Sequence, residues 1–246
     1  GGSVSATSDS TRPPIMLLGK FSGGDKPSLM GIGDSITHGA GASSDGIGFF
    51  FPALFNNYAS KTLPIAGIQC AQVGSNSNQW TNDSLYPGQG ARLQAIAKYA
   101  NVAVERYGIN TLASGYAAII ADRKVLWAMF KAANAGISGG RTPKVIALAL
   151  TPYTTSSDSW ATYANQTVVA NAGGVGGNLD LLNQGLTAIV GASDGPDVYF
   201  DNTTSARGTG SDYWKWSPSS TADGLHPITS RYQVMADDVR ALFQAQ

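Results

Sequence analysis

Apolar stretches alternate along the chain with segments of helical periodicity. Five short apolar runs predict β-strands, at residues 29–32, 65–73, 102–107, 144–150 and 198–200. Four segments repeat apolar residues at the spacing of one helix face, at 91–100, 115–133 and 179–190 and in a last helix lined by Tyr232, Met235, Val239 and Leu242. Ser230 and Gln233 predict a capping box at the start of that last helix.

The alternation of strands and helices favours an α/β fold, with a parallel sheet covered by helices on both faces. In such a sheet, ligands bind outside the carboxyl ends of the strands. Ser35, Gly74 and Asn110 each follow one of the predicted strands closely. We therefore expect these three positions, although far apart in the sequence, to converge on one edge of the sheet.

The length of 246 residues is typical of one domain. Residues 1–14 are rich in Gly, Ser and Thr and lack the apolar stretch of a signal peptide. We expect a flexible linker or an artificial tail there, as in a processed protein or an excised domain, and a single domain over residues 15–246. No apolar run approaches the roughly 18 residues of a membrane span.

Charged residues make up 13% of the chain, and 16 basic residues balance 16 acidic ones. Without a basic stripe, neither nucleic acid nor an anionic membrane is an expected partner. The low charge and the 30 glycines favour an extracellular, periplasmic or virion-associated protein, and the oligomeric state stays open. One cysteine and two histidines cannot build a usual zinc site, so we expect no metal and no other cofactor. The lone Cys70 lies in an apolar run, which favours a buried hydrophobic role over a nucleophilic one.

Two short motifs at opposite ends of the chain contain the three groups that nucleophilic acyl transfer requires. Ser35 ends a Gly-Asp-Ser tripeptide at a predicted strand-to-helix turn, although it could also be an ordinary helix N-cap. Asp223 and His226 are three residues apart, so one turn can point both side chains the same way. The carboxylate can then hold Nδ1–H of the imidazole while Nε2 faces the serine. The alternative for this pair is a loop aspartate and a solvent-exposed histidine.

The chain contains few competitors for these roles. The other histidine, His38, lies one turn after Ser35 and cannot easily point back at its hydroxyl, so we expect a rim or solvent residue. Two Gly-x-Ser-x-Gly strings, at 136–140 and 191–195, follow helices and precede strands, which is the reverse of a nucleophile elbow. We interpret both as helix ends and turns. Gly31 and Gly33 have the spacing of the first two glycines of a dinucleotide-binding fingerprint, but the third glycine of that pattern is missing.

Two further positions can stabilise an oxyanion. The side-chain amide of Asn110 is a suitable donor because it stabilises developing charge without losing a proton. Gly74 can add a backbone N–H from the end of the second strand. A turn asparagine and a plain turn glycine are the alternatives.

Four short blocks occur along the chain: Gly33-Asp34-Ser35, Gly74, Gly108-Ile109-Asn110 and Asp223-Gly224-Leu225-His226. Their order is that of the four blocks of the SGNH (GDSL-type) hydrolases. The chain resembles this family over about residues 29–243. The resemblance implies a flavodoxin-like, three-layer α/β/α sandwich with a five-stranded parallel sheet. It further implies that Ser35 is the nucleophile, His226 the base and Asp223 the residue that orients His226. The implied oxyanion hole consists of the Ser35 and Gly74 backbone N–H groups and the Asn110 side chain.

The third block departs from the family pattern. Thr111 follows Asn110 where the family usually has Asp, which affects the support of the loop more than the chemistry. Glu105 and Arg106 interrupt a strand that is usually apolar. We expect these two residues to pair with each other or to face a loop.

Aromatic residues recur in segments expected at the pocket rim, where flat rings among polar residues suit the faces of sugars. They are Trp80, Tyr86, Tyr153, Trp160, Tyr213, Trp214 and Trp216, of which Trp80, Tyr86, Tyr153, Trp160 and Trp214 are the substrate-binding candidates. The alternative is that these rings pack within their own loops. The same segments contain few aliphatic residues, which disfavours a long acyl chain.

Three functions stay open. The first is hydrolysis of a short-chain ester, favoured as the acetyl ester of an O-acetylated carbohydrate, in a secreted enzyme or a phage tail protein. The second is a general short-chain or lipolytic esterase, or an acyltransferase with the same triad. The third is a non-catalytic glycan-binding module, which an intact Ser35, Asp223 and His226 disfavours.

Overall fold

A computed structural model describes residues 27–42, 48–50, 52, 66–135 and 142–244. Five parallel strands form its central sheet, in the order β2-β1-β3-β4-β7. They are β1 (Ser28–Gly33), β2 (Ala66–Gln69), β3 (Val102–Arg106), β4 (Lys144–Leu148) and β7 (Val198–Phe200). The strand order reverses at β1, because the chain passes first to β2 on one side and then to β3 on the other. Such a switch point is where open α/β sheets bind ligands.

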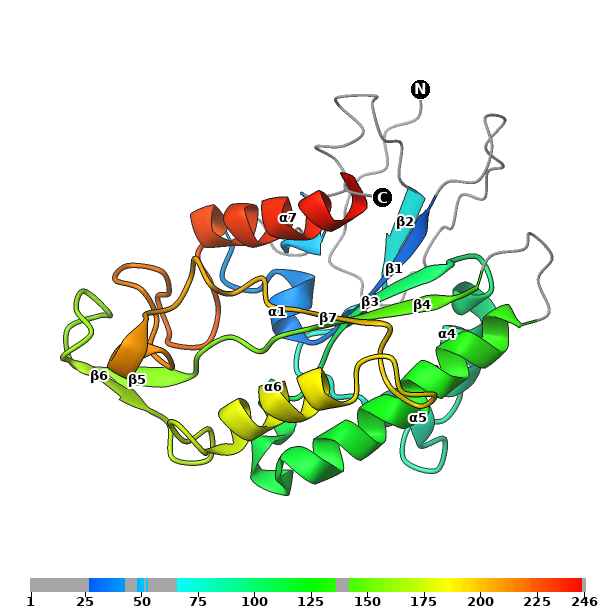
Figure 1. Ribbon diagram of the computed structural model, residues 1–246, viewed down its shortest axis with the longest axis horizontal. Coiled ribbons are helices and arrows are strands. Elements are labelled where there is room, and N and C mark those ends of the chain that lie inside the picture. Colours follow the sequence, from blue (N-terminus) through cyan, green and yellow to red (C-terminus); the bar gives the residue numbers. More distant parts are fainter. Residues whose placement is uncertain (1–26, 43–47, 51, 53–65, 136–141, 245–246) are drawn as a thin grey trace.

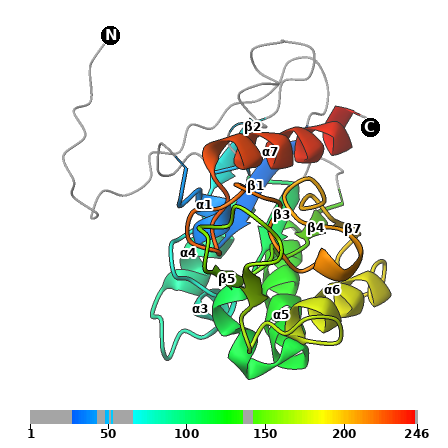
Figure 2. The same cartoon turned by 90° about the vertical axis from the view of Figure 1, so that its left-hand side faces the viewer.

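Helices cover both faces of this sheet and make the structure three layers thick (Figures 1 and 2). One face carries α7 (Thr229–Gln244). On the opposite face α5 packs against α4 and α6. The remaining helices are α1 (Ser35–His38), α3 (Asn78–Thr81), α4 (Gln89–Ala97), α5 (Tyr116–Asn134) and α6 (Asn178–Ala188), with 3-10 turns at Ile109–Ser114 and Gly210–Asp212. This is the α/β/α sandwich that the sequence resemblance implies.

All five predicted strands and four predicted helices are found, with shifts at their ends. The second strand is shorter than expected and ends at Gln69, while residue 65 lies outside the described residues. The predicted capping box is wrong. The last helix begins at Thr229, where the Ile228 carbonyl accepts the first turn's N–H groups, and the Gln233 side chain donates to Asp237 instead (3.2 Å). The expected tail at 1–14 also lies outside the described residues.

A small antiparallel hairpin, which the sequence analysis did not predict, lies beyond the carboxyl end of β4. Its strands are β5 (Thr154–Ser156) and β6 (Gln166–Val168), seen at one end of the molecule in Figure 1. These three-residue strands contain mainly Thr, Ser and Gln and have no apolar run, so periodicity does not reveal them.

Glu105 and Arg106 do not pair with each other and do not face a loop. Consecutive strand residues point to opposite faces of a sheet, so the two side chains separate. Glu105 forms a fully buried ion pair with Arg123 of α5 (2.7 Å) and accepts a hydrogen bond from Trp127 (2.9 Å). Arg123 also donates to the Tyr107 carbonyl (3.1 Å), directly before the loop that carries Asn110. The charge in this strand therefore ties β3 to α5.

Within the described residues, no helix combines the length and the apolar character that crossing a membrane requires.

The Glu105–Arg123 pair gives a stability prediction. Glu105→Ala leaves the Arg123 charge buried without a counterion, and we expect the free energy of unfolding to fall by about 3–5 kcal/mol. Asp194→Ala is the control, because Asp194 pairs with Lys124 at the surface and such pairs contribute about 1 kcal/mol or less. Urea denaturation of both variants measures the difference. Equal losses in the two variants would contradict the structural role of the buried pair.

Candidate active site

Ser35 lies at the first position of α1, just after β1, which lies between β2 and β3 in the sheet. Asp34 is the N-cap of this short helix, and its Oδ1 accepts a hydrogen bond from the Ile36 N–H (3.0 Å). The cap ends the strand and turns the chain, so that Ser35 lies at the carboxyl edge of the sheet. The Ser35 residue is only 4% exposed.

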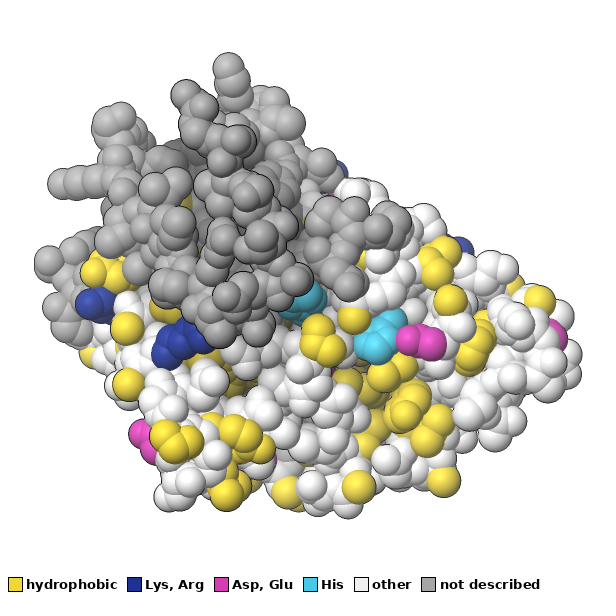
Figure 3. All heavy atoms as spheres, turned by 180° about the vertical axis from the view of Figure 1, so that it is seen from behind, with side chains coloured by type: hydrophobic (Ala, Val, Ile, Leu, Met, Phe, Trp, Pro, Cys, Tyr) yellow, Lys and Arg dark blue, Asp and Glu magenta, His cyan; other side chains and the backbone are white. Residues whose placement is uncertain are grey.

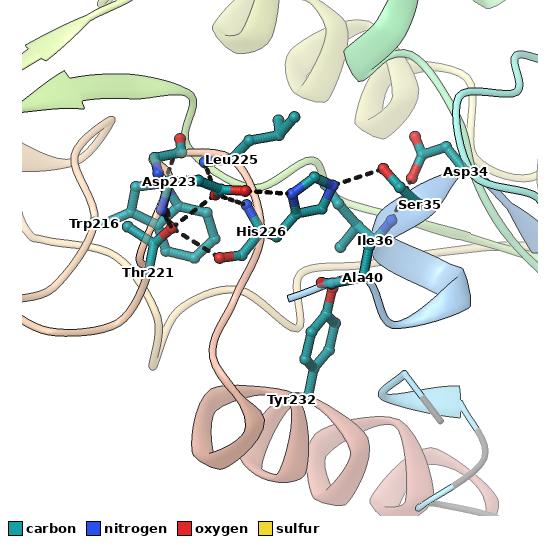
Figure 4. A network of polar contacts seen from close by, with 11 residues as sticks. Asp34, Ser35, Ile36, Ala40, Trp216, Thr221, Asp223, Leu225, His226 and Tyr232 are labelled. Carbon is teal, nitrogen blue, oxygen red and sulfur yellow. Dashed lines mark hydrogen bonds and ion pairs between the residues drawn. The ribbon is translucent and has the colours of Figure 1, made fainter. Parts of the chain in front are cut away.

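The histidine near the end of the chain contacts this serine. His226 Nε2 lies 2.8 Å from Ser35 Oγ, and His226 Nδ1 lies 2.6 Å from Asp223 Oδ2. Figure 4 shows the three side chains in a line, with the imidazole between the hydroxyl and the carboxylate. The structure thus brings together the three residues that the sequence analysis proposed as a triad. At the surface, histidine and acidic side chains lie side by side, bordered by hydrophobic ones (Figure 3).

The turn that carries Asp223 fixes the carboxylate in its ionised form. Asp223 Oδ1 accepts the backbone N–H groups of Leu225 (2.9 Å) and His226 (2.8 Å). Partial burial acts to raise the pKa of Asp223, but the hydrogen bonds from the His226 ring and from these N–H groups outweigh it and hold the pKa below its usual range. The carboxylate is therefore charged at neutral pH and accepts the Nδ1 proton of His226.

His38, the competing base, takes no part in this array. It ends α1, and its Nδ1 is buried without a hydrogen-bond partner among the described residues. Its backbone carbonyl accepts a hydrogen bond from Gln69 (3.2 Å). His226, and not His38, is the histidine that contacts the Ser35 hydroxyl.

The loops after β1, β2 and β3 are joined through Ser75. Its hydroxyl contacts the Gly33 carbonyl at the end of β1 (3.1 Å), and its backbone carbonyl accepts a hydrogen bond from Asn110 Nδ2 (2.9 Å). Gly74 and Asn110 are both exposed and belong to two loops that this bond holds together. The expected convergence at the sheet edge is therefore found, and among the described residues the Ser75 carbonyl is the one hydrogen-bond acceptor for Asn110 Nδ2.

Tyr107 forms further polar contacts at the same edge of the sheet. Its hydroxyl accepts a hydrogen bond from Trp80 Nε1 (2.7 Å) and lies 3.3 Å from the Ser75 hydroxyl. Burial raises the pKa of the Tyr107 phenol above its usual range, so the group stays protonated. Sequence reasoning missed Ser75 and Tyr107, because neither residue carries a recognisable motif.

Two of the five aromatic candidates for substrate binding are wrong. Trp80 is 2% exposed and Trp214 is 3% exposed, and both rings belong to the hydrophobic core, as does Trp216. Tyr86, Tyr153, Trp160 and Tyr213 are partly exposed. Of these, Trp160 adjoins the triad, since its ring lies against Gly224.

The Gly-x-Ser-x-Gly strings and Cys70 are the remaining candidates from the sequence. The 191–195 string lies in the loop between α6 and β7, as expected, whereas the 136–140 string lies outside the described residues. Cys70 is only partly buried, and burial raises the pKa of its thiol to about 12. A thiol with so high a pKa is protonated at neutral pH and is a poor nucleophile.

No family model and no curated protein matches the sequence. Solved structures with related folds do match. A carbohydrate acetylesterase family member from Sinorhizobium meliloti superposes with a TM-score of 0.61 at 14% identity, over 89% of this chain and 98% of the other. The aryl esterase of M. smegmatis has a TM-score of 0.60 at 16% identity, over 89% and 99%. A lipase from a goat rumen metagenome has a TM-score of 0.59 at 15% identity, over 88% and 97%.

These similarities define the class of fold. The chain has the three-layer fold expected from its resemblance to the SGNH hydrolases, and that resemblance is confirmed at the level of the fold. Identities of this size leave the substrate open, because the similar structures include enzymes named for carbohydrate, aryl and lipid esters.

A second carboxyl group is buried next to the nucleophile. Asp34 has no exposed surface, and its Oδ2 has no hydrogen-bond partner among the described residues. Burial raises the pKa of Asp34 to about 6, although the nearby Arg106 guanidinium acts in the opposite direction. Burial likewise lowers the pKa of Arg106 to about 10, which leaves it charged at neutral pH.

The raised pKa of Asp34 predicts a pH-dependent stability. The folded protein binds this proton more tightly than the unfolded chain does, so the contribution of Asp34 is complete below about pH 4 and is lost as the pH rises through about 6. The loss is on the order of 2–3 kcal/mol. Asp34→Asn keeps an oxygen for the Ile36 N–H and cannot ionise, so its stability should decline less over this range. Urea denaturation at several pH values across this range measures the free energy of unfolding of both proteins. If the two free energies change in parallel with pH, the raised pKa of Asp34 is refuted.

Proposed function

We propose that this protein is a serine esterase that hydrolyses short-chain, above all acetyl, esters, with an O-acetylated carbohydrate as the favoured substrate. The observation that carries the proposal is the array of Ser35, His226 and Asp223 at the switch point of the sheet. A nucleophile in contact with a base, and a base oriented by a carboxylate, is the arrangement that acyl transfer uses on several unrelated folds.

The proposed reaction has two halves. Ser35 Oγ attacks the ester carbonyl while its proton passes to His226 Nε2, and the resulting imidazolium is stabilised by the Asp223 carboxylate. His226 then returns the proton to the alcohol oxygen, the carbon–oxygen bond of the ester breaks, and the acyl group stays on Ser35. A water molecule, deprotonated by His226, attacks the acyl-enzyme, and the carboxylic acid leaves as the Ser35 hydroxyl is restored.

The tetrahedral intermediates carry a negative oxygen that needs hydrogen-bond donors. We assign this role to the backbone N–H groups of Ser35 and Gly74 and to the side chain of Asn110. The bond from Asn110 Nδ2 to the Ser75 carbonyl supports the assignment, because it holds the amide in one orientation before substrate arrives. Donors that are fixed in advance need no reorganisation during the reaction.

The preference for a carbohydrate ester depends on the rings near the triad. Trp160 lies partly exposed beside Gly224, and Tyr153 directly precedes the β5 strand that contacts the same turn. Aromatic rings are suited to stack on the apolar faces of sugars while polar neighbours bind the hydroxyl groups. The similarity to a carbohydrate acetylesterase family member of the same fold is consistent with this preference.

Substrate profiling tests the activity. We expect the wild-type protein to hydrolyse p-nitrophenyl acetate faster than the octanoate and dodecanoate esters, and to release acetate from acetylated xylan or another O-acetylated glycan. Ser35→Ala should reduce turnover by at least about 10³-fold, because triad residues act as a unit. Full activity in Ser35→Ala would refute the mechanism. A preference for the long esters would favour a lipolytic enzyme, and glycan binding without hydrolysis would favour a binding module.

The role of Asn110 can be tested separately. Asn110→Ala removes one oxyanion donor, and we expect kcat to fall by about 100- to 1,000-fold with little change in KM. Thr111→Ala is the matched control, because Thr111 adjoins Asn110 and, among the described residues, its hydroxyl hydrogen-bonds only to the Gly108 carbonyl of the same turn (3.4 Å). Steady-state kinetics with p-nitrophenyl acetate measure both variants. A loss in Asn110→Ala no larger than that in Thr111→Ala would exclude Asn110 from the oxyanion hole.

A further inference from the structure

The Gly224 carbonyl anchors the turn that carries Asp223 and His226 to β5 and to Trp216. The Gly224 oxygen accepts hydrogen bonds from the Thr154 backbone N–H (2.9 Å) and from the indole N–H of Trp216 (2.8 Å). Both donors come from outside the turn, one from β5 and the other from the segment before the turn. Gly224 directly follows Asp223 and is two residues before His226, so fixing its carbonyl constrains the backbone that carries both side chains.

The turn can approach β5 this closely only because position 224 is glycine. Gly224 has a φ of +79°, and a Cβ atom there would overlap the Thr154 carbonyl oxygen and the ring of Trp160. The backbone of the turn therefore lies directly against the backbone of the hairpin.

Trp216 is itself held in a fixed orientation by the hairpin. The Gln166 side chain on β6 accepts the Trp216 N–H at Oε1 (2.9 Å) and donates from Nε2 to the Trp216 carbonyl (2.8 Å). Gln166 is 3% exposed and Trp216 has no exposed surface, so water does not compete for these bonds. These bonds hold the backbone of Trp216, and its buried ring directs the indole N–H at the Gly224 carbonyl.

The other sides of the turn are also fixed. Thr221 Oγ1 accepts the Gly224 N–H (2.9 Å) and donates to the His226 carbonyl (2.7 Å). The backbone of Gly41 packs so closely that a Cβ there would lie 2.8 Å from His226 Cβ. Figure 4 shows Trp216 and Thr221 beside the turn, on the side away from Ser35. The Trp216 side is where the hairpin, which has no part in the central sheet, can act on the triad.

We propose that Trp216 is a positioning residue for the triad: its indole N–H fixes the Gly224 carbonyl and thereby sets the distance between His226 Nε2 and Ser35 Oγ. The inference rests on the proposed esterase function. A residue that only filled the core would need its ring but not its N–H. The hydrogen bond is therefore the part of Trp216 that distinguishes positioning from packing.

Trp216→Phe and Trp214→Phe form a matched pair of variants. Both replace a buried tryptophan by a smaller ring, and both leave a cavity that lowers stability. Only Trp216→Phe also removes a hydrogen bond, because the Trp214 indole N–H has no hydrogen-bond partner among the described residues. We expect Trp216→Phe to lower kcat for p-nitrophenyl acetate by about 10- to 100-fold with KM within about twofold, since small misplacements of reacting groups have effects of this size. Trp214→Phe should keep kcat within about twofold.

Proton NMR adds a measurement that does not depend on turnover. The proton shared by His226 Nδ1 and Asp223 Oδ2 should give a far-downfield resonance in the wild type and in Trp214→Phe, and it should broaden or move upfield in Trp216→Phe. Equal kcat and an unchanged resonance in both variants would overturn the positioning role. A third outcome separates the two proposals. If the resonance is present in the wild type and changes in Trp216→Phe, but the wild type has no esterase activity, the proposed function fails while the positioning role stands.

A third variant tests the hydrogen bond if Trp216→Phe does not fold. Incorporation of 3-benzothienylalanine at position 216 replaces the indole N–H by sulfur and keeps the size of the ring. We expect it to reproduce the loss of kcat and the change in the resonance. Wild-type kinetics with this residue would contradict the proposal directly.

Discussion

The hydrogen bond between Ser35 Oγ and His226 Nε2 joins two loops that are 191 positions apart in the sequence, and the proposed chemistry depends on its length. The parallel sheet makes the contact possible, because it places the end of β1 between β2 and β3 and leaves the carboxyl edge open to the segment before α7. The parallel sheet alone brings the two backbones close to each other. Polar contacts around the two loops then set the positions of the Ser35 and His226 side chains.

These contacts share a physical form. Buried side chains donate to or accept from backbone groups of the functional loops: Asp34 to the start of α1, Ser75 to the end of β1, Arg123 to the end of β3, and Trp216 to the turn before His226. Buried hydrogen bonds are costly to leave unmade, so each loop has one strongly preferred position. A buried contact of this kind also accounts for Glu105 in β3. Glu105 holds Arg123, and Arg123 holds the strand end that leads to Asn110.

Much of the fold and the contact of Ser35, His226 and Asp223 could be predicted from the sequence, because both have local patterns. Short apolar runs and helical periodicity predict the strands and helices, and scarcity of histidine limits the choice of base. The support of the site could not be predicted in this way. Trp216, Gln166 and Ser75 act through contacts with residues 8 to 50 positions away, and no spacing in the sequence encodes them. Two of the aromatic candidates failed for a related reason: Trp80 and Trp214 lie in segments with the composition of a sugar-binding rim, but their rings are buried in the core.

The central claim is that Ser35 is a nucleophile activated by His226, and covalent labelling tests it most directly. The protein is treated with a fluorophosphonate, digested and analysed by mass spectrometry. The account predicts one phosphonyl adduct, on the peptide that contains Ser35, formed at a rate that His226→Ala greatly reduces and His38→Ala leaves nearly unchanged. An adduct on another residue, or labelling of Ser35 at an equal rate in His226→Ala and the wild type, would contradict it.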